Sequence, residues 1–588
     1  IRIYLSKMKK LFFITMLLVS TICSYSTTYY VATTGNNGNA GTSTGSAWAT
    51  LTYAMGGSSP VTAGDTVYVK AGNYGNENIV CTKNGTQNNL IVVKGYVTTP
   101  GDQPIIAVNK ADTSAALVTS AMPTYTGTSR TSGICIDMEG VEYVAMINLQ
   151  ITNYAYGIIA GDATAKKGIE LDNISVHTIG DPNASYSGLG IRFGSPSTKF
   201  NKYCKLRRIL VVNSCAEGIS FAGNNSVIDS CFVYNNDNTL NARTDYFYFI
   251  QGDYNSITNC KLWQPPSTAS GNHGFSLKSN REQVIDLGLP YAIQGCYRNK
   301  IRFCTAYNIN ESFVFRHRDV RENLVEYCEA YGTQTLGGAA GNGNGVVIRD
   351  GASDNIVRYC KFKDCFSGIK FQDTSEDGGA QLCGYRNVIA NCIIDNCYYG
   401  VDATSTGVAS EAGNNLISNC SFYLSRYVIR ANRSCDSLRF VGNIFQGSSG
   451  LGYGGGWYTG TNTGDIIPNG STAYFKDCDY YNIEGGMPTN FVTNTVGGIS
   501  GNPLFTNPSG GDFTLQSSSP CIDACDNIEA ETVKTAPFCH LEHIDPMLSF
   551  LCSNRNHLRN KPHVWRDYVG TLCPVGSYAD MGAYEYKP

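Results

Sequence analysis

A six-residue pattern that recurs along the chain restricts its fold more than any other feature of the sequence. The pattern is Asn or Ser, any residue, an aliphatic residue, two variable positions and Cys. Seven copies end in Cys, and an eighth has Gly there: SVIDSC (226–231), NSITNC (255–260), NKIRFC (299–304), NLVEYC (323–328), NIVRYC (355–360), NVIANC (387–392), NLISNC (415–420) and SLRFVG (437–442). Cys231 and Cys420 are 189 residues apart over six unequal intervals, a mean of 31.5. A fixed strand with connections of variable length is typical of a parallel β-solenoid, in which each coil buries its apolar side chains against its neighbours.

The repeated cysteines are expected to form a column inside the solenoid. Strands of adjacent coils lie about 4.8 Å apart, so identical positions stack on one another. Small apolar thiols suit such a buried column, and we expect them to be free. Disulfide bonds are expected instead among the cysteines of the tail, with no pairing readable from the sequence: Cys521, Cys525, Cys539, Cys552 and Cys573.

A second predicted strand precedes each hexapeptide and alternates with a period of two. The segments are HGFSLK (273–278), ESFVFR (311–316), NGVVIR (344–349), SGIKFQ (367–372) and YGVDAT (399–404). Their third and fifth residues are mostly apolar and are expected to point inward. The second, fourth and sixth residues then point outward. This places Lys278, Arg316 and Arg349 in one outward column on three successive coils.

The composition agrees with an all-β chain rich in turns. The 588 residues are 42% hydrophobic and only 15% charged, with 63 Gly and 38 Tyr. This is too apolar for a disordered chain. The 44 basic and 47 acidic residues give a net charge of −3, so we expect no nucleic-acid partner.

The termini predict a secreted protein with three parts. Met8-Lys9-Lys10, the apolar run 11–19 and Ser24-Tyr25-Ser26 are typical of a signal peptide, with a run too short to span a bilayer. We therefore assign residues 1–26 to a leader and signal peptide and 27–500 to a single-stranded right-handed parallel β-helix. Residues 501–588 are assigned to closing coils and a cap with a Cys-rich insertion, residues 525–579, of unknown role. The mature protein is expected to be a monomer without a membrane span.

The basic column suits an extended anionic polymer, and for a secreted protein the natural candidate is an acidic polysaccharide. In a uronic acid the C5 proton lies beside a carboxylate. Eliminating the 4-linked sugar requires neutralisation of that carboxylate, a base for the C5 proton and an acid for the leaving oxygen. Lys278 acts as a base only in its neutral form, which the Arg316 guanidinium about one coil away would favour.

The segments GFSLKSN (274–280) and 299–328 resemble the active-site region of polysaccharide lyase family six, the β-helical alginate lyases and chondroitinase B. In that family a Lys-Ser pair is followed on the next coil by Arg-His-Gly. The resemblance implies that Lys278, followed by Ser279, is the base, and that Arg316, followed by His317, is the acid or charge stabiliser. Arg318 stands where the family has Gly, and an additional loop, residues 282–297, follows the lysine.

The family often has acidic calcium ligands shortly before the lysine, but residues 271–274 read Gly-Asn-His-Gly. We therefore assign no cofactor, and the arginines 316, 318 or 349 would neutralise the substrate instead.

The other predicted substrate-binding residues are His273 and Glu311, at the heads of their strands, with His317, Arg318 and Arg349. Such a His273 is more often a turn or surface residue than a catalytic one, and Glu311 could equally hold an arginine in place or be a solvated strand-end carboxylate. Alternation directs His317 away from Arg316 unless the strand bends. Arg349 and Asp350 could form a simple surface ion pair.

We predict a polysaccharide lyase acting by β-elimination. The alternatives are a non-catalytic carbohydrate-binding or structural β-helix and a glycoside hydrolase on the same fold. The missing acidic ligands, the Arg at position 318 and the additional loop favour the first alternative. No local pair of carboxylates in the sequence argues for the second.

Overall fold

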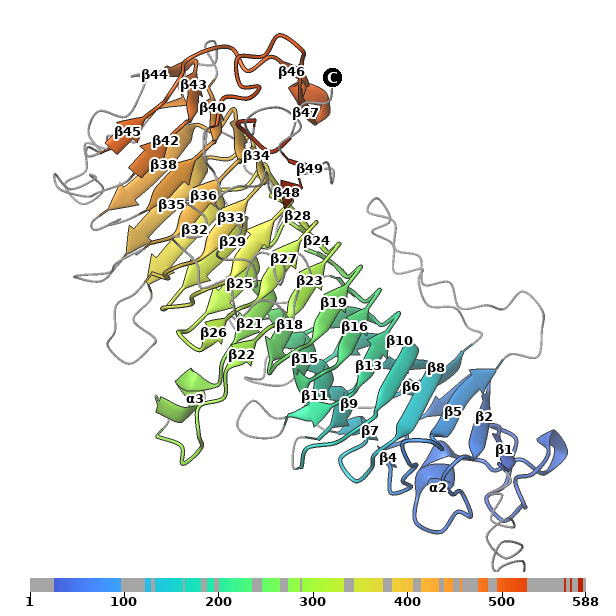
Figure 1. Ribbon diagram of the computed structural model, residues 1–588. Helices are drawn as coiled ribbons and strands as arrows, with labels where there is room; N and C mark the ends of the chain where they lie inside the picture. The colour runs from blue at the N-terminus through green and yellow to red at the C-terminus, as the bar shows by residue number, and fades with distance from the viewer. Residues whose placement is uncertain are drawn as a thin grey trace, which may run out of the picture.

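The chain forms a long parallel β-helix, as the sequence predicts (Figure 1). The computed structural model describes residues 26–96, 122–127, 133–161, 164–180, 188–194, 200–234, 246–264, 273–285, 288–332, 343–373, 383–405, 414–432, 438–447, 455–456, 474–484, 494–525, 565–566, 572–573 and 580–584. The predicted signal peptide falls almost wholly outside these residues. Within them, no helix is long and apolar enough to cross a membrane.

One long parallel sheet, here called the site sheet, contains the predicted Lys278, Arg316 and Arg349 strands. The predicted segments 273–278, 311–316 and 344–349 coincide with its strands β21, β25 and β29. Its strands are β4 (Ile79–Val80), β7 (Ile134–Asp137), β9 (Tyr156–Ala160), β11 (Leu189–Phe193), β12 (Asn201–Lys202), β15 (Glu217–Asn224), β18 (Tyr246–Gln251), β21 (His273–Lys278), β25 (Glu311–Arg316), β29 (Asn344–Arg349), β32 (Ser367–Asp373), β35 (Tyr399–Ser405), β38 (Tyr427–Asn432), β41 (Gly455–Gly456) and β44 (Ile483–Glu484).

The remaining faces of the solenoid form a second sheet, whose strands lie on both sides of a bend in each coil. The strands are β1 (Thr28–Val31), β2 (Thr66–Lys70), β3 (Gly72–Gly75), β5 (Ile91–Tyr96), β6 (Pro123–Thr126), β8 (Val144–Thr152), β10 (Glu170–Ile179), β13 (Lys205–Arg207), β14 (Leu210–Ser214), β16 (Val227–Asp229), β17 (Phe232–Tyr234), β19 (Ser256–Thr258), β20 (Lys261–Trp263), β23 (Lys300–Arg302), β24 (Thr305–Tyr307), β27 (Leu324–Glu326), β28 (Glu329–Tyr331), β30 (Ile356–Arg358), β31 (Lys361–Lys363), β33 (Val388–Ala390), β34 (Ile393–Asp395), β36 (Leu416–Ser418), β37 (Ser421–Tyr423), β39 (Arg439–Val441), β40 (Ile444–Gln446), β42 (Tyr474–Lys476), β43 (Asp479–Tyr481) and β45 (Asn494–Val496).

Short elements lie at the edges of the stack. The parallel pair is β22 (Cys296–Tyr297) with β26 (Val320–Arg321). The antiparallel pairs are β46 (Phe505–Asn507) with β47 (Asp512–Leu515), and β48 (Trp565–Arg566) with β49 (Leu572–Cys573). The helical turns are η1 (Thr44–Ser46), α2 (Leu51–Met55), α3 (Arg281–Ile285) and η2 (Pro508–Gly510).

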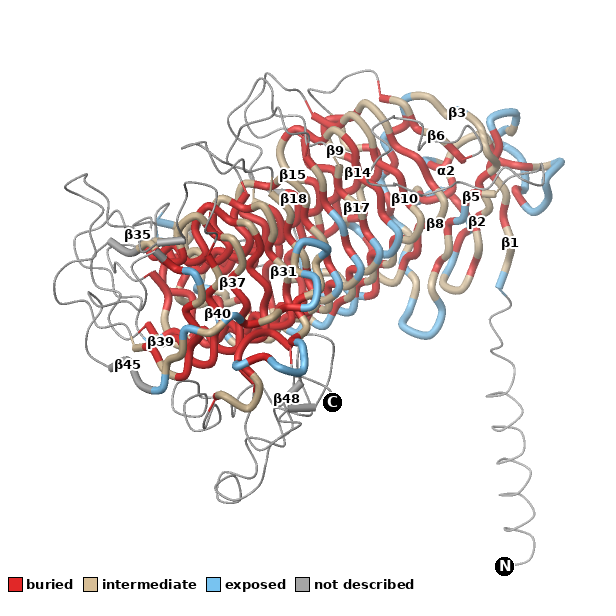
Figure 2. The backbone as a smooth tube through the Cα atoms, turned by 90° about the horizontal axis from the view of Figure 1, so that it is seen from above, coloured by how far each residue is buried: buried red, intermediate tan, exposed pale blue. Residues whose placement is uncertain are grey.

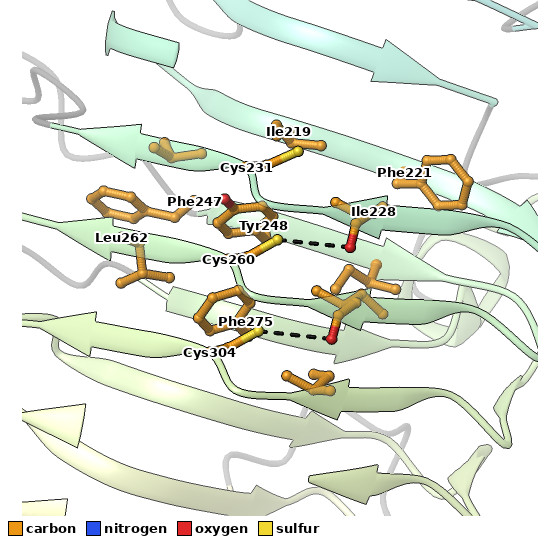
Figure 3. Packing of buried hydrophobic residues seen from close by; sticks show 14 of the residues in the cluster. Ile219, Phe221, Ile228, Cys231, Phe247, Tyr248, Cys260, Leu262, Phe275 and Cys304 are labelled. Carbon is orange, nitrogen blue, oxygen red and sulfur yellow. Dashed lines mark hydrogen bonds between the residues drawn. The ribbon is translucent and has the colours of Figure 1, made fainter. Parts of the chain in front are cut away.

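The interior of the solenoid is a continuous apolar column along its whole length (Figure 2). The seven repeated cysteines are buried and free, as the sequence predicts. Their thiols reach carbonyl groups of the neighbouring coil: Cys260 Sγ lies 3.8 Å from the oxygen of Ile228, and Cys304 Sγ 3.7 Å from that of Ile257 (Figure 3). Aromatic rings from the site sheet, such as Tyr248 and Phe275, pack in the same core.

The two bends that flank each hexapeptide strand use left-handed backbone, a feature that the sequence pattern did not predict. The residue before the first position and the residue before the Cys both have φ between 48° and 59°; these residues are Asn225, Ser230, Tyr254, Asn259, Arg298, Phe303, Glu322, Tyr327, Asp354, Tyr359, Arg386, Asn391, Asn414 and Asn419. Many are Asn or Asp, which tolerate this conformation better than most residues. The residues that are neither Asn nor Asp adopt the left-handed conformation because every coil must turn at the same two places.

The first position of the hexapeptide forms a buried ladder of asparagines. The Oδ1 atom of Asn323 accepts from both the backbone N and the Nδ2 of Asn299, each at 2.9 Å. Its own Nδ2 donates to Asn355 Oδ1 on the next coil, also at 2.9 Å. The same arrangement links Asn355 to Asn387. The ladder therefore satisfies backbone groups at a bend where no strand pairing is available.

The C-terminal segment differs from the expected closing coils. Within the described residues 501–525 and 580–584 no strand stacks on the last coil; β46 and β47 form an antiparallel pair that packs against the side of the solenoid. Phe513 contacts Tyr423 with 5.4 Å between ring centroids. The segment covers the second hexapeptide position, which is aliphatic in these coils: Leu324, Ile356, Val388 and Leu416.

The tail cysteines that the structure describes do not form the expected disulfides. Cys521 is buried with a free thiol that contacts Asp479, and Cys525 is buried. Cys539 and Cys552 lie outside the described residues, as does the side chain of Cys573.

Candidate functional site

Lys278, Arg316 and Arg349 occupy one register position on three successive strands of the site sheet. Lys278 pairs with Arg316 between β21 and β25, and Arg316 pairs with Arg349 between β25 and β29. The neighbouring residues Leu277, Phe315 and Ile348 are fully buried in the core, so the cations point away from it. The predicted outward column is therefore present.

The column is covered, in contrast to the open groove expected from the sequence. Lys278, Arg316 and Arg349 are only 4%, 5% and 6% exposed. Part of the cover is the additional loop that follows β21, which forms α3 beside the stack (Figure 1). Alternation along a strand predicts the direction of a side chain, but it does not predict what a later loop places over it.

Glu282, in α3, contacts two of the three cations through one oxygen. Its Oε2 atom forms an ion pair with Lys278 Nζ and lies 3.5 Å from an Nη atom of Arg316. Burial opposes ionisation of Glu282, but the charges of Lys278 and Arg316 outweigh it and lower its pKa. The two head groups thus converge on a single carboxylate.

Arg349 is held by two other carboxylates. Its Nε lies 3.1 Å from Asp350 Oδ2, and its Nη1 lies 3.3 Å from Glu311 Oε2. Asp350 also lies 3.5 Å from Arg316 Nε. Asp350 is fully buried, so the Arg349–Asp350 contact is not the surface ion pair considered from the sequence.

Glu311 and His273 are neighbours at the other end of the same strands. They share a register position, and His273 Nδ1 lies 2.7 Å from Glu311 Oε2. Burial raises the pKa of Glu311, but His273 and Arg349 together bring it far below its ordinary value. Glu311 is therefore an ionised, buried group that positions Arg349, and the solvated strand-end interpretation is wrong.

His317 lies inside the site because the chain bends there. Its φ of 84° breaks the alternation of β25, and the residue is fully buried with Nδ1 3.1 Å from Ser279 Oγ. Burial lowers the pKa of His317 well below its ordinary value, and the positive charges of Lys278 and Arg316 lower it further. The imidazole is thus neutral at pH 7, and its contact with Ser279 links the residue after Arg316 to the residue after Lys278.

Arg318 lies at the edge of this group. It is partly exposed, and its Cβ would be 3.1 Å from a Cβ placed on Gly351, which has φ of 83°. Glycine at 351 therefore permits the close packing of the turn after β25 against the turn after β29. This approach brings Arg318 to the side of the site where Asp350 lies.

The residues around the column do not fit a calcium site. In the described part of the chain, no group of three or more His, Cys, Asp or Glu side chains could hold a metal ion. The carboxylates nearest the column, Glu282, Glu311 and Asp350, are each paired with cations. Calcium prefers six to eight oxygen ligands, which this arrangement does not offer.

No signal in the sequence pointed to Glu282. Lys278 and Glu282 are four residues apart, but that spacing brings side chains together only within a helix, and Lys278 ends a strand. Asp350 and Glu282 both lie just outside the strands, where the two-residue period gives no information.

Comparisons with known proteins give neighbours of the same general fold. No family model and no curated protein sequence matches the chain. Among solved structures, a pectate lyase is 12% identical, with 97% of this chain and 98% of that chain covered and a TM-score of 0.33. A mannuronic acid specific polysaccharide family 6 lyase from human gut microbiota is 13% identical, with 80% and 82% covered and a TM-score of 0.36. A GH136 lacto-N-biosidase from Eubacterium ramulus is 10% identical, with 83% and 69% covered and a TM-score of 0.34. All three TM-scores are below 0.5, so these similarities carry no functional argument, and the function is argued from the site.

Proposed function

We propose that the protein is a secreted polysaccharide lyase that cleaves a uronic-acid-containing polysaccharide by β-elimination. The observation that carries the proposal is the convergence of Lys278 and Arg316 on one carboxylate oxygen, that of Glu282. Two cations that hold the carboxylate of a side chain can hold that of a uronic acid in the same way. The acidic polymer would run along the column, across successive coils.

The proposed reaction uses Lys278 as the base and Arg316 as the acid or charge stabiliser. Arg316 binds the substrate carboxylate and favours the negative charge that develops when C5 is deprotonated. Neutral Lys278 takes the C5 proton, the C4=C5 double bond forms, and the C4–O bond breaks with its electron pair on the leaving oxygen. That oxygen then takes up a proton, so each cleavage yields one unsaturated and one reducing end.

The other site residues orient these two groups. Glu311 and Asp350 hold Arg349, which contributes positive charge at the next coil. His317 ties the turn after Arg316 to Ser279, the residue after Lys278. We propose that His273 and Arg318 contact the sugar units beside the cleaved bond.

A glycoside hydrolase is disfavoured by the ionisation of the nearby carboxylates. Such enzymes need one carboxylic acid that stays protonated near neutral pH, hence with a raised pKa. The pKa values of Glu282 and Glu311 are both lowered, because Lys278 and Arg316 surround the first and His273 and Arg349 the second. A non-catalytic structural β-helix is the second candidate, favoured by the near-complete burial of Lys278 and Arg316, which leaves a sugar no access to them in the described form.

The test is incubation with alginate, pectate and chondroitin sulfate, followed by the ultraviolet absorbance of the new C4=C5 double bond. We expect absorbance with one of these polymers, and its loss in Lys278→Ala. Lys261→Ala is the matched control, because Lys261 is exposed on β20, in the other sheet. Reducing ends without absorbance would indicate hydrolysis, and a Lys278→Ala protein that retains turnover would remove this residue from the mechanism.

A further inference from the structure

The carboxylate of Glu282 lies where the proposed function requires the carboxylate of the substrate. Both cations assigned to the reaction, Lys278 and Arg316, contact its Oε2 atom. A uronic acid cannot contact the same two head groups while Glu282 remains between them. The described structure is therefore a closed form of the site.

The position of Glu282 is fixed by the segment on either side of it, which is tied down at several points. Arg281 forms an ion pair of 2.5 Å with Asp319, on the turn after β25. Asn280 Oδ1 accepts from the backbone N of Gln294, which closes the base of the loop. These contacts direct Glu282 toward the column without burying it: its side chain is 34% exposed, against 5% for Lys278.

The difference in exposure separates Glu282 from the other carboxylates of the site. Asp350 has no exposed side-chain surface and Glu311 only 7%, so neither can leave without opening the sheet edge. Glu282 reaches solvent and belongs to a loop outside the coil. Breaking its contacts costs ion pairs but exposes no apolar core.

A second observation on the neighbouring coil agrees with a closed form. Gln251 ends β18, next along the sheet from β21, and it is fully buried. Among the residues that the structure describes, neither its Oε1 nor its Nε2 has a hydrogen-bond partner. A buried amide without partners is costly, and such groups in native proteins call for a ligand, a water or a change of conformation.

We propose that Glu282 is the intramolecular occupant of the carboxylate-binding site, which the carboxylate of a uronic acid displaces when substrate binds. The inference rests on the proposed function for the identity of that ligand. It makes Glu282 a competitor of the substrate, so the apparent affinity equals the intrinsic affinity multiplied by the open fraction of the site.

The first experiment measures access to Lys278 without any ligand. The protein is treated with an amine-acetylating reagent, and modification of Lys278 is followed by peptide mass spectrometry. Glu282→Gln keeps the size of the side chain and removes its charge, so we expect Lys278 to be acetylated several-fold faster than in the wild type. Glu322→Gln is the matched control: it removes the same charge, but Glu322 pairs with Arg298 on another face.

The second experiment measures binding of a saturated oligouronate, of the polymer class that gives turnover or otherwise of each class in turn, by calorimetry. We expect the dissociation constant to fall about tenfold in Glu282→Gln, because removal of the competitor raises the open fraction, and to stay unchanged in Glu322→Gln. Unchanged acetylation of Lys278 would overturn the proposal. Equal or weaker oligouronate binding by Glu282→Gln, including no binding by either protein, would overturn it as well.

These results are distinguishable from failure of the proposed function. A wild-type protein that forms no double bond, but whose Glu282→Gln variant binds oligouronate more tightly, would be a binding protein with Glu282 as its competitor. If the wild type forms the double bond and Glu282→Gln binds oligouronate with unchanged affinity, the lyase function stands and the role of Glu282 as a competitor is overturned.

Discussion

The last described coil contains a buried carboxylate that should make the stability of this region depend on pH. Asp479, the first residue of β43, is fully buried. Its Oδ2 accepts a hydrogen bond of 3.3 Å from the thiol of Cys521, which belongs to the C-terminal segment on the side of the solenoid. Burial raises the pKa of Asp479 to about 7, and the hydrogen bonds from Cys521 and from the backbone of Gly501 and Tyr480 only partly offset this.

The magnitude follows from the difference between the folded and unfolded states. The ordinary pKa of an aspartate is 3.8, and the folded value is about 7. The folded state holds the proton more tightly, so the stabilisation is complete below pH 3.8 and is lost as pH rises toward 7. At 1.36 kcal/mol per unit, the loss is about 4 kcal/mol. Above pH 7 this residue contributes no further change.

The assay is hydrogen exchange of the amides of β43 between pH 4 and pH 8, corrected for the intrinsic effect of pH on exchange. We expect their opening free energy in the wild type to fall by a few kcal/mol over this range. Asp479→Asn keeps the shape and cannot ionise, so its opening free energy should change little with pH. A wild-type profile that is flat, or that rises with pH, would refute the reasoning, as would an equal slope in the variant.

Two further predictions concern the interior of the solenoid. Asn323→Ala should lower the free energy of unfolding in urea by about 3 kcal/mol or more, because two donors of Asn299 lose their acceptor and each costs about 1–3 kcal/mol. The Cys360 thiol should not react with a thiol reagent at pH 8 until the protein is unfolded, because burial raises its pKa well above the ordinary value. Rapid labelling of Cys360 in the native protein, measured by mass spectrometry, would contradict the burial of the cysteine column.

The repeating part of the fold could be predicted because each coil places the same residue types at the same positions of a short segment. A coil has few ways to bury an aliphatic residue and a cysteine at fixed positions, and one is to stack them on the next coil. The two-residue period of 273–278 then gave the strand, its bounds and its direction, so Lys278, Arg316 and Arg349 were placed in one column. The asparagine ladder was visible in the same pattern, but its hydrogen bonds depend on the bend at the preceding residue, which no periodicity reveals.

The non-repeating parts could not be predicted in the same way. The aliphatic residues at the second hexapeptide position, such as Leu324 and Ile356, show that a side of the solenoid is covered. They do not show what covers it. The structure identifies the C-terminal segment, whose Phe505 and Phe513 belong to the same apolar cluster although they lie about 150 or more positions further along the chain. Contacts between segments so far apart produce no periodic pattern in the sequence, because the residue types of each segment reflect only its own strand or turn.

The three stacked cations of the site explain why carboxylates surround them. Cations stacked at the strand spacing of about 4.8 Å repel one another by roughly 3 kcal/mol per pair at an effective dielectric constant of 20. A covered column of three must therefore have carboxylates from outside its register. Two of them, Asp350 and Glu311, belong to the site sheet and its turns, and they remain with Arg349 in any state that keeps the coil folded. The third comes from a loop, and it is the one that touches Lys278. Under the proposed function, the base Lys278 is thus the cation whose counterion comes from outside the coil, and displacement of Glu282 is the step that would open the buried lysine to a polymer.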